Sequence, residues 1–274
     1  MASPVLASLH VFPVKAAQGH APDEAFVEPW GISGDRRWML VDGSAKVVTQ
    51  RQYARLALTR AEPLPGGAVR LSAPGRAPLT VTVPDPVHRT SVQIWGDKVE
   101  AVPADEAAGD WFSEFLGTEL RLVHLADPAT SRPIDPDYAH RGETVSFADG
   151  FPLLVTSLAS LDALNALIAH GDHAAEGPLP MNRFRPNLVV TGTEAWAEDH
   201  WSRIAVGEVT FRVAKKCGRC AVTTTDQHTA VRGREPLRTL ARHRRIDGKL
   251  VFGQNLVPEH PGTLRVGDPL TVLG

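Results

Sequence analysis

The chain has 274 residues, of which 43% are hydrophobic and 22% are charged, and its formal net charge at pH 7 is −2. This size and composition describe a globular protein with one large domain or two modest ones. The near-neutral charge predicts no nucleic-acid partner and no anionic membrane surface as a partner. The first residues lack the pattern of a secretion signal, and no apolar stretch approaches the roughly 18 residues that span a bilayer, so we expect a cytoplasmic protein.

Short β-like runs, each closed by Gly, Pro or Asp, dominate the first hundred residues. They occupy residues 7–14, 36–42, 46–52, 57–63, 68–74, 79–86 and 90–102. This spacing predicts an antiparallel barrel or sandwich. The period changes at residues 104–117, where Trp111, Phe112 and Phe115 recur at helical spacing. We predict an amphipathic helix there that ends at Gly117, and a domain boundary close to it.

The second half predicts a long loop, two helices and several strands. Residues 128–152 are rich in Pro, Asp and Gly and predict a long ordered loop. Residues 157–171 start with a serine, end with a glycine and repeat leucine at helical spacing, which predicts a helix. A second, short helix is predicted at 235–245. Strands are predicted at residues 187–192, 202–214, 220–226, 250–257 and 263–274.

Both cysteines of the chain, Cys217 and Cys220, lie three positions apart. A structural zinc site commonly needs four ligands in two such pairs, and the second pair is absent. A thioredoxin-like pair needs a strand-to-helix junction, whereas strands are predicted on both sides here. Burial of two small apolar side chains remains an alternative.

The surroundings of the two thiols favour a chemical role. Lys215, Lys216 and Arg219 place three cations beside them and favour thiolate over thiol. A thiolate is a good ligand for soft or high-valent metal ions. Three threonines and Asp226 follow and can hydrogen-bond around such a centre. Asp226 either delivers a proton or braces the cysteine loop, and its position after a threonine run favours the brace.

The sequence RFRPN at 183–187 predicts a second site feature. If these residues are extended, Arg183 and Arg185 point to one face and form a clamp for phosphate or carboxylate, with the amide of Asn187 beside them. Lys15 comes just after a predicted strand, and Arg36 just before another, so both lie at strand ends. The alternative is that these cations are solvated surface residues.

Taken in order, the segments FPVKA, GDRRWMLVD, RFRPN, CGRCAVTTTD, FGQN and VGDP resemble the motifs of the molybdenum cofactor sulfurase C-terminal domain (MOSC) superfamily. The resemblance runs from about residue 6 to the end of the chain. It is greatest to the amidoxime-reducing members and their bacterial relatives. It implies a strand-dominated α+β fold, with an N-terminal β-barrel region at 1–122 and a MOSC domain with a β-barrel core and flanking helices at 123–274.

The resemblance also implies a molybdenum cofactor, that is, molybdenum held by molybdopterin and by one protein thiolate. In this sequence the metal ligand is Cys220. The implied cofactor contacts are Lys15, Arg36, Ala148, Asp149, Gly150, Arg183, Asn187, Gly218 and Arg219.

The implied activity is the reduction of N-hydroxylated compounds such as amidoximes, hydroxylamines and N-hydroxylated bases. The implied partners are separate electron-transfer proteins, a flavin reductase with a haem or iron–sulfur carrier. Two alternatives remain open. One is a molybdenum cofactor carrier or sulfur-transfer module that uses Cys220, and the other is a metal-free binding protein.

Overall fold

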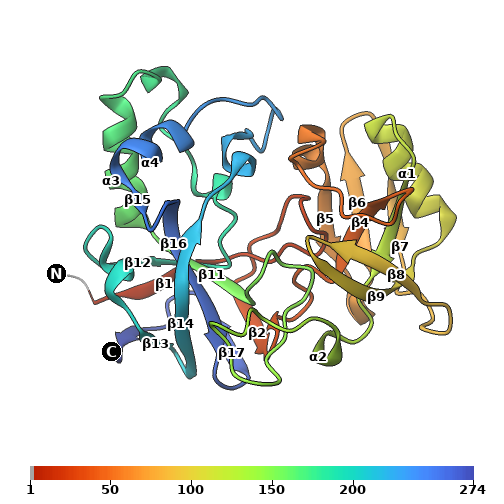
Figure 1. Cartoon of the computed structure of the whole chain (residues 1–274), viewed down its shortest axis with the longest axis horizontal. Coiled ribbons are helices and arrows are strands. Elements are labelled where there is room, and N and C mark those ends of the chain that lie inside the picture. Colours follow the sequence, from red (N-terminus) through yellow and green to blue (C-terminus); the bar gives the residue numbers. More distant parts are fainter. Residues whose placement is uncertain (1–2) are drawn as a thin grey trace.

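A computed structural model describes residues 3–274 and shows two lobes side by side (Figure 1). The large lobe is built on one eight-stranded sheet in the order β1–β12–β11–β16–β14–β13–β18, with β15 paired to β16. Its strands are β1 (Val5–Leu9), β11 (Leu153–Ser157), β12 (Leu188–Thr191), β13 (Arg203–Val206), β14 (Val209–Gly218), β15 (Arg245–Ile246), β16 (Lys249–Pro258) and β18 (Leu270–Val272). A bridge from Val5 to Pro269 joins the two ends of this order, so the sheet nearly closes into a barrel.

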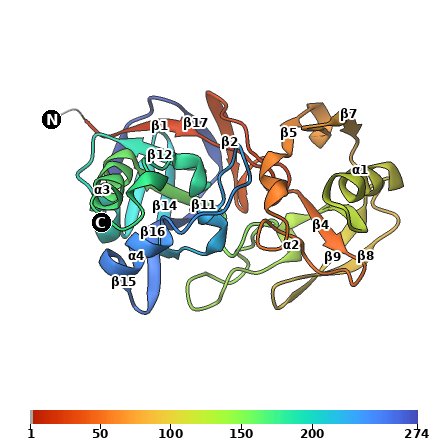
Figure 2. The ribbon, with the colours of Figure 1, turned by 90° about the horizontal axis from the view of Figure 1, so that it is seen from above.

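Two helices flank the large lobe, α3 (Leu158–Ala169) and α4 (Leu237–His243), and they lie together on its outer side (Figures 1 and 2). Both confirm helices predicted from the sequence. In α3, the side chains of Leu161, Leu164 and Ile168 are buried. This apolar stripe at i, i+3 and i+7 is the reason the segment folds as a helix against the sheet.

The small lobe contains two antiparallel sheets and α1 (Glu106–Leu116). The first sheet has the order β4–β10–β9–β8, with β4 (Trp38–Asp42), β8 (Thr90–Ile94), β9 (Asp97–Pro103) and β10 (Leu120–His124). The second is β5 (Arg60–Pro63), β6 (Val69–Ala73) and β7 (Arg76–Val81). The helix α1 buries Trp111, Phe112 and Phe115, and it ends at Gly117, whose φ of 73° suits a residue without a side chain. This confirms the predicted helix and the strand-dominated α+β fold.

No single boundary in the sequence separates the two lobes. Strand β1 pairs with β12 of the large lobe, and a further sheet joins β2 (Glu24–Glu28) and β3 (Gly31–Ile32) to β17 (Gly262–Arg265). Strands β1 and β2 therefore pair with strands from the C-terminal half, whereas a single boundary at residue 122 is predicted from the sequence. Pairing of β1 covers the edge of β12, which would otherwise leave backbone groups without partners.

Two predicted strands are wrong. Residues 46–52 contain a turn in which the N–H groups of Gln52 and Tyr53 both donate to the carbonyl of Thr49. Residues 221–224 form a 3₁₀ helix, because the hydroxyl groups of Thr223 and Thr224 donate to carbonyls three residues earlier. Such side-chain bonds to the local backbone compete with strand pairing.

The predicted long loop at 128–152 holds just one turn of helix, α2 (Pro128–Ser131). The 3₁₀ helices are η1 (Ala54–Leu58), η2 (Pro65–Gly67), η3 (Ala174–Glu176), η4 (Met181–Arg183), η5 (Ala197–His200) and η6 (Ala221–Thr224). Within residues 3–274, no helix combines the length and the apolar character that a membrane crossing requires.

Candidate functional site

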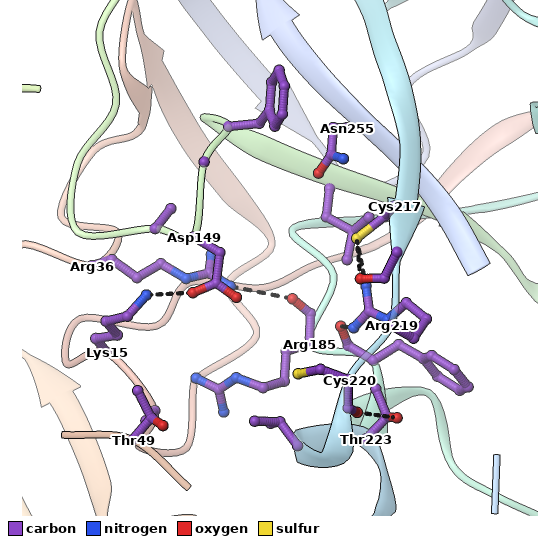
Figure 3. A pocket seen from close by; sticks show the side chains of 18 of the residues that line it. Lys15, Arg36, Thr49, Asp149, Arg185, Cys217, Arg219, Cys220, Thr223 and Asn255 are labelled. Carbon is purple, nitrogen blue, oxygen red and sulfur yellow. Dashed lines mark hydrogen bonds and ion pairs between the residues drawn. The ribbon is translucent and has the colours of Figure 1, made fainter. Parts of the chain in front are cut away.

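A pocket of about 140 Å³ is lined by residues of both lobes (Figure 3). Nine residues that the sequence assigned to a site lie in its wall: Lys15, Arg36, Ala148, Asp149, Gly150, Asn187, Gly218, Arg219 and Cys220. The wall also contains Thr49, Arg51, Arg185, Cys217 and Asn255. The structure places the remaining two assigned residues, Arg183 and Asp226, outside this wall.

Strand β14 carries Cys217 near its end, and Cys220 follows two residues beyond the strand. The N–H of Arg219 donates to the carbonyl of Leu250 at 2.7 Å, which continues the pairing with β16. Both the N–H and the hydroxyl of Thr223 donate to the carbonyl of Cys220. The backbone is therefore held on both sides of Cys220, while its partly exposed thiol lines the pocket.

Lys15 is a buried cation in the pocket wall, with 5% of its surface exposed. Its Nζ donates to the carbonyl of Phe147 at 2.7 Å and pairs with Asp149 at 2.6 Å (Figure 3). Burial lowers the pKa of Lys15 from 10.5 to about 8, although the carboxylate of Asp149 opposes this. Partial desolvation would raise the pKa of Asp149, whose side chain is 70% exposed, but the neighbouring ammonium of Lys15 outweighs it and the net shift is downward. Both groups are therefore charged at pH 7.

The loop that carries Asp149 is held in place by Arg132, which is 5% exposed. The guanidinium of Arg132 donates to the carbonyls of Ala148 and Asp149 and pairs with Asp97. The sequence alone does not indicate Arg132, because its charged partner, Asp97, lies in another part of the chain.

Arg36 and Arg185 bring two guanidinium groups to one ring. Their Cζ atoms lie 4.4 and 4.3 Å from the ring centroid of Phe12. Both residues have positive φ, 47° and 55°, which costs roughly 1–2 kcal/mol per non-glycine residue. The pKa of Arg185 is lowered, mainly by burial and to a smaller extent by repulsion from Arg36. A strained backbone that holds like charges together marks a site for an anion.

Asn187 fixes the position of Arg36. Its Oδ1 accepts from Arg36 Nη1 at 3.1 Å and from the N–H of Leu154, and its Nδ2 donates to the carbonyl of His10. The same Nη1 of Arg36 is also paired with Asp35. The amide of Asn187 therefore already has protein partners on both ends.

The extended conformation predicted for residues 183–187 is wrong. Met181–Arg183 form η4, and the ring of Phe184 stacks on the buried Phe252 with 3.9 Å between centroids. Together with the positive φ of Arg185, this turns the two arginines apart. Arg185 lines the pocket, whereas Arg183 donates to the carbonyl of Thr224 at 3.0 Å and lies outside it.

Asp226 braces the loop that follows η6. Its Oδ1 accepts from the backbone N–H groups of His228 and Thr229, and its Oδ2 pairs with Arg183 at 3.0 Å. Burial would raise the pKa of Asp226, but these hydrogen bonds and the guanidinium lower it overall. The carboxylate of Asp226 is used by neighbouring groups and lies outside the pocket wall, so the structure shows the brace that the sequence favoured and not a proton donor in the pocket.

Each cysteine accepts a hydrogen bond from one arginine. Arg219 Nη1 donates to Cys217 Sγ at 2.8 Å, and Arg51 Nη2 donates to Cys220 Sγ at 3.2 Å. Arg51 was not expected at the site, because residues 46–52 were predicted to form a strand and instead form a turn. The run of polar residues at 50–52 breaks the alternation that a half-buried strand requires.

The pocket is strongly cationic. Five cations line it, namely Lys15, Arg36, Arg51, Arg185 and Arg219, and within residues 3–274 they face one lining carboxylate, that of Asp149. Guanidinium groups suit phosphate and carboxylate ligands, and a cysteine thiolate suits a soft or high-valent metal. The described part of the chain has no group of three or more His, Cys, Asp or Glu side chains placed to hold a metal ion.

Comparison with known proteins places the chain in a family. The family model of the MOSC domain matches residues 142–271, and that of the MOSC N-terminal beta barrel domain matches residues 3–119. The chain therefore belongs to the MOSC domain family.

Within this family the likeness to named proteins extends over nearly the whole chain. Mitochondrial amidoxime-reducing component 1 of Homo sapiens is 34% identical over 98% of this chain and 83% of its own length. Mitochondrial amidoxime reducing component 2 of Macaca fascicularis is 34% identical over 97% and 82%. The molybdenum cofactor sulfurase of Danio rerio is 31% identical over 90% of this chain, which corresponds to 31% of that longer protein.

These names contradict the expected cytoplasmic location, since the amidoxime-reducing relatives are named mitochondrial. The expectation was wrong because composition and the lack of an apolar span do not distinguish one compartment from another.

Proposed function

We propose that this chain binds the molybdenum cofactor through Cys220 and reduces N-hydroxylated compounds such as amidoximes. One observation supports this above the others: the thiol of Cys220 lies in a pocket wall with five cations and one carboxylate. The names of the relatives, amidoxime-reducing component and molybdenum cofactor sulfurase, point to the same chemistry.

The donor set fits the cofactor. A cysteine thiolate is a suitable ligand for molybdenum, and the phosphate of a pterin cofactor needs guanidinium or ammonium partners. Lys15, Arg36 and Arg185 are the groups that would hold the phosphate. All three line the pocket, Lys15 and Arg36 are held by hydrogen bonds, and Arg185 lies over the ring of Phe12. The bound cofactor supplies the two-electron chemistry that breaks the N–O bond.

The chain itself contributes binding and charge. Cys220 supplies the thiolate, on a backbone fixed by Thr223 and by the pairing of Arg219 with β16. Lys15 keeps its proton at pH 7, because its pKa of about 8 lies above that value. Reduction of an N-hydroxylated amine consumes two electrons and two protons and releases water. The proposal therefore includes separate electron-donor proteins, a flavin reductase with a haem or iron–sulfur carrier.

Elemental analysis of purified protein tests the proposal. Wild type, Cys220→Ser and Cys217→Ser would be produced in cells that make the molybdenum cofactor, and each would be given benzamidoxime with an artificial electron donor. We expect near-stoichiometric molybdenum and turnover in wild type, and loss of both in Cys220→Ser. Wild type without molybdenum would refute the proposal. Molybdenum without turnover would favour a cofactor carrier or sulfur-transfer module.

A further inference from the structure

Arg51 reaches Cys220 from the other side of the pocket. It lies in the turn between β4 and η1, and its Nη2 donates to Cys220 Sγ at 3.2 Å. The ring of Trp95, in the β8–β9 turn, lies 4.3 Å from the Cζ of Arg51. The guanidinium is thus placed between an indole ring of the small lobe and a thiol of the large lobe.

The turn that carries Arg51 is held by both lobes. The side chain of Gln50 donates to the carbonyl of Ala16 at 2.7 Å and exchanges two 3.0 Å hydrogen bonds with the side chain of Gln227. Arg232 donates to the carbonyls of Gln50 and of Arg51 itself. Gln50 and Gln227 are 0% and 3% exposed, so the hydrogen bonds between their side chains are shielded from water. The backbone that carries the exposed side chain of Arg51 is therefore fixed by both lobes.

The other cations of the pocket have different hydrogen-bond partners, although Lys15 also lies near the ring of Trp95. Arg219 donates to Cys217 Sγ and to the carbonyl of Phe184, and Lys15 is bonded to Phe147 and Asp149. Among the described residues, Arg51 is the one whose side chain is hydrogen-bonded to Cys220 Sγ.

We propose that Arg51 is a positioning residue that orients the sulfur of Cys220 as a metal ligand and withdraws charge from it, with Trp95 holding the guanidinium in place. This inference rests on the proposed function. A hydrogen bond to a ligating sulfur fixes its side-chain rotamer and tunes the metal, and loss of such an outer partner commonly weakens metal binding about 10- to 100-fold. The small lobe would then complete the metal site that the large lobe begins.

Four variants test this role. Arg51→Met removes the donor and keeps the aliphatic stem, Arg51→Lys restores the charge without the planar fork, and Trp95→Leu removes the ring that orients the guanidinium. The matched control is Arg55→Met, which removes an exposed arginine that stacks on Phe115, outside the pocket wall. Thermal unfolding of each variant shows whether it folds.

The readouts are molybdenum per chain during dialysis against buffer and the electron paramagnetic resonance spectrum of the metal. We expect Arg51→Met to weaken metal retention about 10- to 100-fold and to change the spectrum. Arg51→Lys should recover part of both, Trp95→Leu should change them in the same direction, and Arg55→Met should match wild type. Loss in both Arg51→Met and Arg55→Met would show a general fold defect and overturn the inference.

The two proposals fail in different ways. Wild type that binds no molybdenum refutes the proposed function and removes the basis of this inference. Wild type with molybdenum, together with Arg51→Met that keeps both the metal and the wild-type spectrum, refutes the role of Arg51 and leaves the proposed function standing.

Discussion

Replacing Lys15 with methionine removes a buried charge from the pocket wall and should make the cofactor-free protein more stable. Methionine matches the length of the lysine stem and fills the same space without the ammonium group. The ammonium is buried at 5% exposure and is paired with one carboxylate, so its presence in the folded state works against folding at neutral pH.

The size of the effect follows from the pKa of Lys15. Burial lowers it from 10.5 to about 8. One pKa unit corresponds to about 1.36 kcal/mol, so the difference, 10.5 minus 8, places a penalty of about 3 kcal/mol on the folded state while Lys15 is charged. The variant also loses the hydrogen bond to Phe147, which offsets about 1 kcal/mol. The expected gain in unfolding free energy at pH 7 is about 2 kcal/mol.

The pH dependence gives the sharper test. Because the pKa of Lys15 is lowered in the folded state, the penalty is fully present below about pH 8 and disappears as the pH rises toward 10.5, where the unfolded chain also loses the proton. Urea denaturation at pH 7 and pH 10 would compare wild type, Lys15→Met and the exposed control Lys98→Met. The advantage of Lys15→Met should shrink by about 2 kcal/mol between the two pH values.

The control should stay within about 0.5 kcal/mol of wild type at both pH values. The reasoning is refuted if Lys15→Met is less stable than wild type at pH 7, or if its advantage is the same at pH 7 and pH 10. Molybdenum retention, measured on the same variant after expression with the cofactor, should fall, since a group proposed to hold the phosphate is gone.

Three further changes have defined outcomes in urea denaturation. Asp35→Ala removes the acceptor of the buried N–H of Phe12 and the partner of a buried guanidinium, and should cost about 3 kcal/mol. A cost below about 1 kcal/mol would contradict this. Gly253→Ala should cost at least about 2 kcal/mol, since φ is +79° and the new Cβ would lie 2.7 Å from a carbonyl oxygen, whereas Gly43→Ala has open space and should be nearly neutral. His124→Phe should reduce the loss of unfolding free energy that wild type shows as the pH falls. Burial lowers the pKa of His124 from 6.5 to about 4, so wild type loses about 3 kcal/mol between these pH values and the variant should not.

Features that depend on neighbours in sequence were predictable. The helices α1 and α3 carry their apolar stripes within a dozen residues, and both form as expected. The short segments around Lys15, Arg36 and the cysteine pair carried the resemblance to the MOSC family, which the family models confirm. Nine of the assigned residues lie in one pocket wall, although the chain separates Lys15 from Cys220 by some 200 positions.

Predictions of backbone conformation were wrong where the same short sequence can form more than one local structure. The threonine run after Cys220 has the composition of a strand, yet the hydroxyl groups of Thr223 and Thr224 satisfy the backbone locally and form η6. The alternation in RFRPN suggested that Arg183 and Arg185 share a face. Stacking of Phe184 on Phe252 and the positive φ of Arg185 separate them.

By itself, the sequence determined the family, the strand-dominated fold class, the helices α1 and α3 and the cysteine pair that lines the pocket, because each of these depends on residues that are neighbours in the chain. Tertiary structure alone decided that β1 completes the sheet of the large lobe, that Arg185 rather than Arg183 enters the pocket, and that Arg51 meets Cys220. These outcomes depend on contacts between residues far apart in the chain. Such contacts are determined by the packing of the whole molecule. The local pattern of apolar and polar residues carries no information about them.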